Sequence, residues 1–94
     1  MEKIESPVIL IIDDISDNLD LLRNLFKKIY KTRVANSGER GLKILEEHAL
    51  PDLILLDVMI PGINGYEVCR LIKASPRTKD IIIIFPDCKK LIAR

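Results

Sequence analysis

The sequence predicts an α/β protein organised around a parallel β-sheet. Four short, mostly apolar runs alternate with longer stretches in which apolar residues recur at helical spacing. Each run is too short for a helix and is bounded by turn-forming residues. Because strands that alternate with helices are joined by right-handed crossovers, this order predicts parallel strands covered by helices. The four runs are residues 8–12, 33–35, 53–56 and 81–85.

The first strand and the first helix are predicted near the amino terminus. Residues 8–12 are all apolar and mostly β-branched, which favours a strand. The Ser16-Asp17-Asn18 segment offers an N-cap and an acidic first turn, and apolar residues then recur at helical spacing up to about Tyr30. We therefore expect an amphipathic helix that begins near Ser16 and ends near Tyr30.

A second strand and a second helix follow. Residues 33–35 give a weak strand signal, which is typical of a strand at the edge of a sheet. Residues 39–48 have a helical pattern after the Asn36-Ser37-Gly38 turn, although Gly41 costs about 1 kcal/mol of helix propensity relative to alanine. Pro51 separates this helix from the next strand, so the second unit ends before residue 53.

The run at residues 53–56 predicts the central strand. Its four consecutive apolar residues are typical of a parallel strand that is buried on both faces. The run ends at Asp57 and breaks into a loop in which Pro61, Gly62 and Gly65 indicate a turn. The chain therefore places one carboxylate at the carboxyl end of a buried strand, where ligands bind in open α/β sheets.

The last predicted unit is a helix followed by a strand. A third helical pattern begins at about Tyr66 and ends before Pro76. Residues 81–85 then predict a fourth buried strand, which Pro86 stops because proline cannot donate a hydrogen bond to the sheet.

Composition limits the classes of function. The chain has 94 residues, 48% of them hydrophobic and 31% charged, which is typical of one globular domain over residues 1–94. A formal net charge of +1 and 4% aromatic residues argue against a nucleic-acid surface. No apolar run approaches the ~20 residues of a membrane span, and no signal peptide is visible. The two cysteines lack metal or CxxC spacing, which fits a reduced, cytoplasmic setting. From these observations together we expect a soluble, cytoplasmic protein that binds neither nucleic acid nor membrane.

Acidic residues follow two of the predicted strands. Asp13 and Asp14 come directly after residues 8–12, and Asp57 follows residues 53–56. If these strands are neighbours, their ends bring the three carboxylates close together, where they repel one another unless a cation lies among them. Oxygen ligands without His or Cys favour Mg²⁺ or Mn²⁺. A carboxylate beside such an ion can attack phosphorus and form an aspartyl phosphate.

These segments resemble the receiver domain of two-component response regulators from residue 8 to residue 85. The resemblance rests on Ile12-Asp13-Asp14 after the first strand, on Leu55-Leu56-Asp57 after the third, and on the Met59-Ile60-Pro61-Gly62-Ile63-Asn64-Gly65 segment that follows. The Asn36-Ser37-Gly38-Glu39 turn is also similar to the family. The resemblance implies a three-layer, flavodoxin-like fold with a parallel sheet in the strand order 2-1-3-4.

The resemblance also implies a role for each acid. Asp57 would be the phosphoacceptor, Asp14 a direct metal ligand, and Asp13 a ligand directly or through water. The backbone carbonyl of Met59 would supply a further oxygen to Mg²⁺. The donor would be a phosphorylated histidine of a sensor histidine kinase or a phosphotransfer protein, docked on the first helix near Asn18. Such a domain is a switch in a phosphorelay and not a turnover enzyme.

The sequence departs from the family pattern near its carboxyl end. A Ser or Thr that contacts the phosphoryl group in the family falls on Asp87, whose carboxylate would repel that group. A fifth strand, the lysine that follows it and the last helices have no counterpart, so the resemblance implies a receiver domain truncated after its fourth strand. An open edge of isoleucines favours pairing with another chain. We therefore expect a homodimer through residues 81–85 and the carboxyl-terminal tail.

Two other functions stay open at this point. A degenerate or truncated receiver can act as an interaction or dimerisation module that needs no phosphorylation. A haloacid-dehalogenase-like phosphatase also uses an aspartyl nucleophile, but it requires a second Asp two residues beyond Asp57, where Met59 stands. Phosphoryl uptake in the presence of Mg²⁺ separates the switch from the interaction module.

Overall fold

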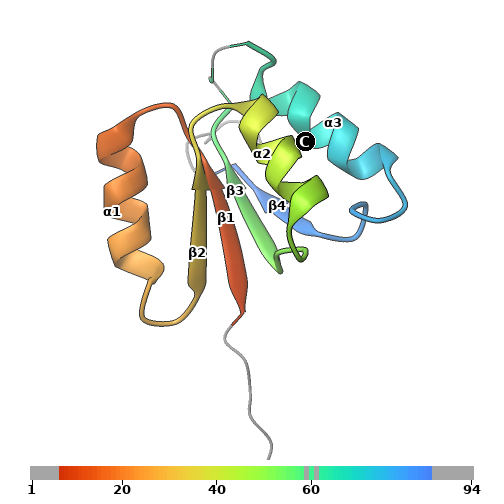
Figure 1. The fold of residues 1–94 in the computed structure, drawn as a ribbon. Coiled ribbons are helices and arrows are strands. Elements are labelled where there is room, and N and C mark those ends of the chain that lie inside the picture. Colours follow the sequence, from red (N-terminus) through yellow and green to blue (C-terminus); the bar gives the residue numbers. More distant parts are fainter. Residues whose placement is uncertain (1–6, 59, 61, 86–94) are drawn as a thin grey trace, which may run out of the picture.

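Strands and helices alternate along the chain, as predicted. The computed structural model describes residues 7–58, 60 and 62–85. In chain order, the elements are β1 (Val8–Ile12), α1 (Ser16–Phe26), β2 (Lys31–Ala35), α2 (Gly38–Glu47), β3 (Leu53–Leu56), α3 (Gly65–Ala74) and β4 (Ile82–Ile84) (Figure 1).

The strands form one parallel sheet in the order β2-β1-β3-β4. This order confirms the expected topology and places β2 at an edge, as its weak strand signal indicated. β1 and β3 are the central neighbours, and Ile12 of β1 is in register with Leu56 of β3. Because all strands point the same way, the residues that follow β1 and β3 emerge at the same edge of the sheet.

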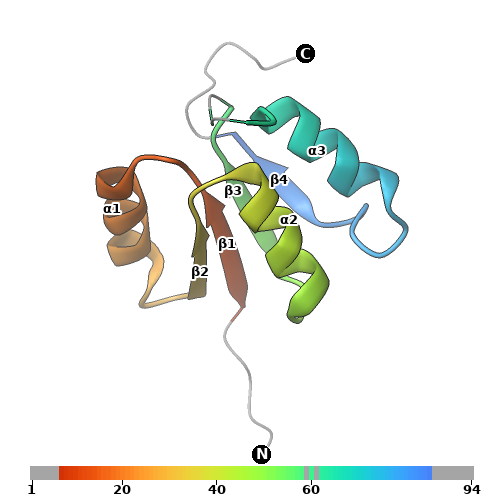
Figure 2. The ribbon, with the colours of Figure 1, turned by 45° about the horizontal axis from the view of Figure 1, so that its top comes forward.

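Helices cover both faces of the sheet and give three layers (Figure 1, Figure 2). α1 packs on one face, where Leu19 joins Ile9 and Ile11 in an apolar cluster. α2 and α3 pack on the other face, in a larger cluster that contains Leu10 and Ile12. Successive residues of β1 thus point to opposite faces. The all-apolar sequence of β1 is explained by its burial on both sides.

The predicted start of the first helix near Ser16 is confirmed, whereas its predicted end near Tyr30 is wrong. Ser16 already belongs to α1, and Ile15 occupies the N-cap position without a capping hydrogen bond from its side chain. The backbone N–H of Ile15 instead donates to Oδ1 of Asp13. At the other end, α1 stops at Phe26, because the N–H groups of Ile29 and Tyr30 both donate to the carbonyl of Phe26 and close a turn.

The prediction that residues 81–85 form a fully buried strand is also wrong. β4 spans only Ile82–Ile84, and these three residues are exposed, half-buried and exposed in turn. Ile81 and Phe85, which flank the strand, pack against the α2–α3 side of the core. Among the described residues β4 has β3 as its single neighbour, and α1 lies over β1 and β2. One face of β4 is therefore uncovered in the part of the chain that the structure describes.

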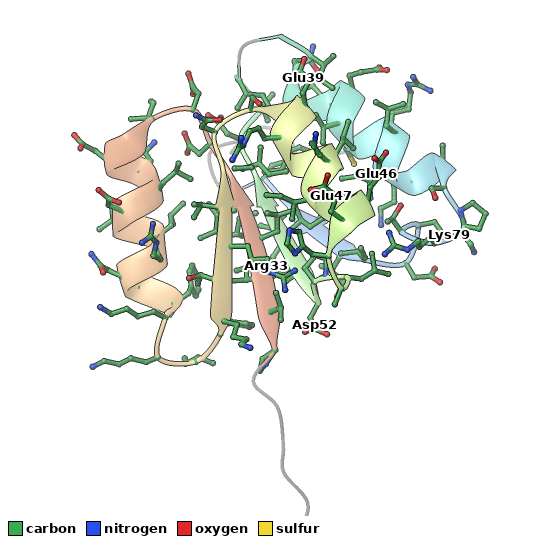
Figure 3. All side chains as sticks on the ribbon, in the orientation of Figure 1. Arg33, Glu39, Glu46, Glu47, Asp52 and Lys79 are labelled. Carbon is green, nitrogen blue, oxygen red and sulfur yellow. The ribbon has the colours of Figure 1, made fainter. Side chains whose placement is uncertain are left out.

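Charged side chains occupy the outer surface. Glu46 and Glu47 project from the carboxyl-terminal turn of α2, and Lys79 lies on the loop before β4 (Figure 3). Arg33 of β2 donates from Nη1 to the carbonyl of Ala49 at 3.0 Å, across the loop that follows α2. Over the described residues, none of the helices combines the length and apolar character needed to span a bilayer.

Candidate functional site

The backbone of the sheet fixes the positions of three acidic residues. Asp13 follows β1, and its N–H donates to the carbonyl of Ala35 in β2 at 3.0 Å. Asp57 follows β3, and its N–H donates to the carbonyl of Ile12 in β1 at 2.9 Å. The sheet therefore extends by one residue beyond both central strands. Asp14 is carried to the same edge as the next residue after Asp13.

The three carboxylates converge at this edge. One oxygen of each of Asp13, Asp14 and Asp57 lies within 4.8 Å of the others. The residues Asp13 and Asp57 are only 5% and 7% exposed, whereas Asp14 is open to solvent. The sequence-based expectation that the first and third strands bring these acids together is confirmed. We call this cluster of three carboxylates the acidic nook; it is open to solvent on the side of Asp14.

The acids interact unfavourably with one another. Burial raises the pKa of Asp13 above its usual value of 3.8, and the negative charges of Asp57 and Asp14 raise that pKa further. Two hydrogen bonds oppose the rise: Asp13 accepts from the N–H of Ile15 at 3.0 Å and from Nδ2 of Asn18 at 3.3 Å. Folding thus brings acidic groups together at a free-energy cost that these two donors only partly offset.

The donor set suits a hard divalent cation. Among the described residues, the nook offers carboxylate oxygens and no nitrogen or sulfur ligand, which is the chemistry that Mg²⁺ and Mn²⁺ prefer. A bound cation would also relieve the repulsion that raises the pKa of Asp13. Met59, whose carbonyl was predicted as a further ligand, lies outside the described residues, as does Asp87. The residues that the structure describes therefore fit such an ion.

The first residue of α3 packs tightly against Asp57. Gly65, predicted as part of a turn, is instead the first residue of α3, and its N–H donates to the carbonyl of Val58 at 2.9 Å. Its Cα packs so closely on Asp57 that a Cβ there would collide with the Asp57 carbonyl oxygen. Gly62 is the turn residue, with φ of +77°, and Asn64 caps α3 by accepting from the N–H of Glu67.

Sequence reasoning missed two contributors to the site. The N–H of Ile15 and the amide of Asn18 both donate to the carboxylate of Asp13 and hold its orientation. Asn18 was predicted only as part of the helix cap and of a docking surface. Its position at the start of an amphipathic helix, five residues beyond Asp13, was the available signal. The contact depends on how α1 leaves the sheet, which residue types alone do not specify.

We expect Asp13→Asn to stabilise the protein at neutral pH in the absence of divalent cations. The folded-state pKa of Asp13 lies above its unfolded value, so the wild-type free energy of unfolding falls as pH rises between these two values. The variant has no carboxylate at this position, so its free energy of unfolding should exceed that of wild type by about 1 kcal/mol. This is the size of one unfavourable charge interaction near the surface. Urea unfolding in chelator at several pH values measures the difference.

The matched control for this prediction is Asp80→Asn, which makes the same chemical change at an exposed side chain beside Lys79. It should not reproduce the gain in stability. A lower stability of Asp13→Asn than of wild type in chelator would show that the hydrogen bonds to the Asp13 carboxylate outweigh the repulsion.

Comparison with known proteins identifies what this arrangement resembles. A family model described as "Response regulator receiver domain" matches residues 9–87. The chain is 39% identical over 85 residues to a Vibrio cholerae protein named "Probable cyclic di-GMP phosphodiesterase", covering 90% of this chain and 19% of that protein. It is 43% identical over 76 residues to the transcriptional regulatory protein AfsQ1 of Streptomyces coelicolor. That match covers 81% of this chain and 33% of that protein. The chain thus spans a third or less of the length of these relatives.

A solved structure of a response regulator receiver protein agrees with the family match. The N-terminal domain of a response regulator receiver protein from Methanoculleus marisnigri superimposes with a TM-score of 0.78 and 35% sequence identity. The match covers 82% of this chain and 63% of that one. The fold and the sequence therefore point to the same group of proteins.

Proposed function

This chain belongs to the response regulator receiver domains, and from that membership we propose that it is a phosphorylation switch in which Asp57 accepts a phosphoryl group from a phosphohistidine. The observation that carries the proposal is the convergence of Asp13, Asp14 and Asp57 at one edge of the sheet. Asp57 directly follows the central strand β3, its N–H donates to Ile12 of β1, and Gly65 packs against its carbonyl group.

The proposed transfer is a displacement at phosphorus. A carboxylate oxygen of Asp57 attacks the phosphoryl group of the donor, and the bond between phosphorus and the histidine nitrogen breaks. The nitrogen keeps the electron pair and takes up a proton from solvent, which leaves neutral imidazole, while Asp57 becomes an acyl phosphate. A divalent cation, when bound, would lower the charge that builds up on the phosphoryl oxygens. The burial of Asp57 limits the access of water to the reacting atoms.

The remaining acids have proposed roles as ligands of Mg²⁺ or Mn²⁺. Asp14 is exposed and free to turn toward an ion, which suits a direct ligand. The carboxylate of Asp13 already accepts two hydrogen bonds, which orient it toward the nook and suit a ligand directly or through water. The carbonyl of Met59 stays a prediction from the resemblance. With this arrangement Asp57 contributes both the nucleophile and one charge of the site.

The partner proposed for this site is a histidine kinase or a phosphotransfer protein. The exposed edge around Asp14 and Ile15 would admit the imidazole of such a donor. We assign no turnover activity to this chain, and the activities named for the longer relatives belong to those proteins. The cytoplasmic location and the lack of nucleic-acid and membrane binding expected from the sequence stay part of this proposal.

Phosphoryl uptake from a small donor tests the proposed function. We expect the purified chain, incubated with acetyl phosphate and Mg²⁺, to gain the mass of one phosphoryl group in intact mass spectrometry. The gain should disappear when a chelator replaces Mg²⁺ and should reverse in alkaline hydroxylamine, which cleaves acyl phosphates. A chain that binds Mg²⁺ yet never gains this mass would contradict the switch and favour an interaction module that needs no phosphorylation.

A further inference from the structure

The first turn of α1 begins without a side-chain cap of its own. Ile15 stands at the N-cap position, and its apolar side chain accepts no hydrogen bond. Helices commonly satisfy the free N–H groups of the first turn with a Ser, Thr, Asp or Asn at this position. At the start of α1, two donors instead reach back to the acidic nook, because the N–H of Ile15 and the side-chain amide of Asn18 both donate to Asp13. The start of the helix and the nook therefore share one carboxylate.

The two hydrogen bonds hold different oxygens of Asp13. The N–H of Ile15 donates to Oδ1 at 3.0 Å, and Nδ2 of Asn18 donates to Oδ2 at 3.3 Å. With both oxygens engaged, rotation of the carboxylate is restricted. The charges of Asp14 and Asp57 act against this placement, because like charges at such short range repel one another. Of the two donors, only the amide of Asn18 can be removed by a side-chain substitution, since the other belongs to the backbone.

We propose that Asn18 is a positioning residue of the cation site, which holds the Asp13 carboxylate at the edge that it shares with Asp14 and Asp57. A ligand that is already in place loses less conformational freedom when the cation arrives, so the site binds more tightly. Loss of a hydrogen-bond partner of a metal ligand typically weakens metal binding by about 10- to 100-fold. The inference rests on the cation site of the proposed function and needs no phosphoryl transfer.

The same hydrogen bond couples the cation to α1. Because Asn18 favours cation binding through its bond to Asp13, a bound cation must favour that bond by the same factor. Asn18 lies within the turn that is closed by the backbone hydrogen bond from the N–H of Leu19 to the carbonyl of Ile15, at 3.1 Å. A cation in the acidic nook should therefore stabilise the first turn of α1, the part of the chain on which the docking of the phosphoryl donor was predicted.

A titration with Mn²⁺, followed by the electron paramagnetic resonance of the free ion, tests the positioning role. Asn18→Leu has nearly the size of the wild-type side chain but no donor. We expect it to bind Mn²⁺ about tenfold more weakly than wild type, at the lower end of the usual range because 3.3 Å is a long hydrogen bond. Asn18→Gln keeps an amide donor and should recover part of this loss. Asn24→Leu is the matched control, because Asn24 is an exposed residue of the same helix, and it should bind Mn²⁺ like wild type.

Hydrogen exchange tests the coupling between the cation and α1. In wild type, saturating Mg²⁺ should slow amide exchange at Leu19 by up to about tenfold, because the cation stabilises the turn that this amide closes. In Asn18→Leu the same addition of Mg²⁺ should slow exchange at Leu19 much less, and in Asn24→Leu as much as in wild type. Circular dichroism verifies that each variant is folded.

The possible results separate this inference from the proposed function. Equal Mn²⁺ affinities of wild type and Asn18→Leu would overturn the positioning role and leave the phosphoryl switch standing. An affinity of Asn18→Gln or Asn24→Leu as low as that of Asn18→Leu would also overturn it, because the loss would then not follow the amide donor. Binding that depends on Asn18 in a chain that takes up no phosphoryl group would support the positioning role and contradict the switch. A wild-type chain that binds no Mn²⁺ would overturn both.

Discussion

Asp57→Asn is expected to abolish phosphoryl uptake from acetyl phosphate. Asparagine has almost the same size as aspartate, but its amide lacks the negative charge that makes the carboxylate a nucleophile. Asp57 lies at the edge that the ends of β1 and β3 share, and its N–H donates to Ile12 through the backbone, which the substitution leaves in place. Intact mass spectrometry after incubation with acetyl phosphate and Mg²⁺ measures the uptake. We expect the uptake of the variant to fall below about one hundredth of the wild-type level.

Two controls test whether the loss of phosphoryl uptake is caused by removal of the nucleophile. Asp80→Asn, at an exposed side chain in the loop before β4, should take up phosphoryl groups like wild type. Asp57→Asn keeps the backbone hydrogen bond to Ile12, and urea unfolding verifies that the variant is folded, which excludes loss of the fold as the cause. Full uptake by Asp57→Asn would move the phosphoacceptor to another acid and contradict the assignment.

The framework of this site was predictable because its signals are local. The apolar runs that form β1 and β3 are buried on both faces, and each ends abruptly in aspartate. Parallel strands end at one edge, so their alternation with helices already implies that the acids share an edge. The adjacency of β1 and β3 came from the resemblance to receiver domains, because alternation alone is compatible with several strand orders.

The features that escaped prediction depend on contacts between distant segments. A run of isoleucines reads as a buried strand, but the exposure of Ile82 and Ile84 is decided by which neighbours cover the edge. The cap of α1 was not predicted: Ile15 stands at the N-cap position, and its N–H donates to the carboxylate of Asp13 across the end of β1. Gly65 was interpreted as a turn residue because composition cannot show that another backbone passes against its Cα.

Gly65→Ala is expected to destabilise the protein by about 3 kcal/mol, near the upper end of the cost of overpacking. In an ordinary helix this change stabilises by up to about 1 kcal/mol. Here the new Cβ would meet the carbonyl oxygen of Asp57 and would lie 2.7 Å from the Cα of Val58. Both are backbone atoms, and Asp57 is tied to β1 through its N–H, so neither can turn aside as the end of a side chain could. Urea unfolding measures the loss of free energy.

Gly41→Ala provides the comparison that isolates this cause. Its new Cβ would meet the terminal methyl group of Ile12, a side-chain atom that can shift, so we expect a loss of about 1 kcal/mol. Because relief of the clash at Gly65 requires Asp57 to move, Gly65→Ala should also slow phosphoryl uptake under conditions in which it is fully folded. Gly41→Ala should not slow it. Equal stability of wild type and Gly65→Ala would mean that the first turn of α3 adjusts freely and does not hold the phosphoacceptor in place.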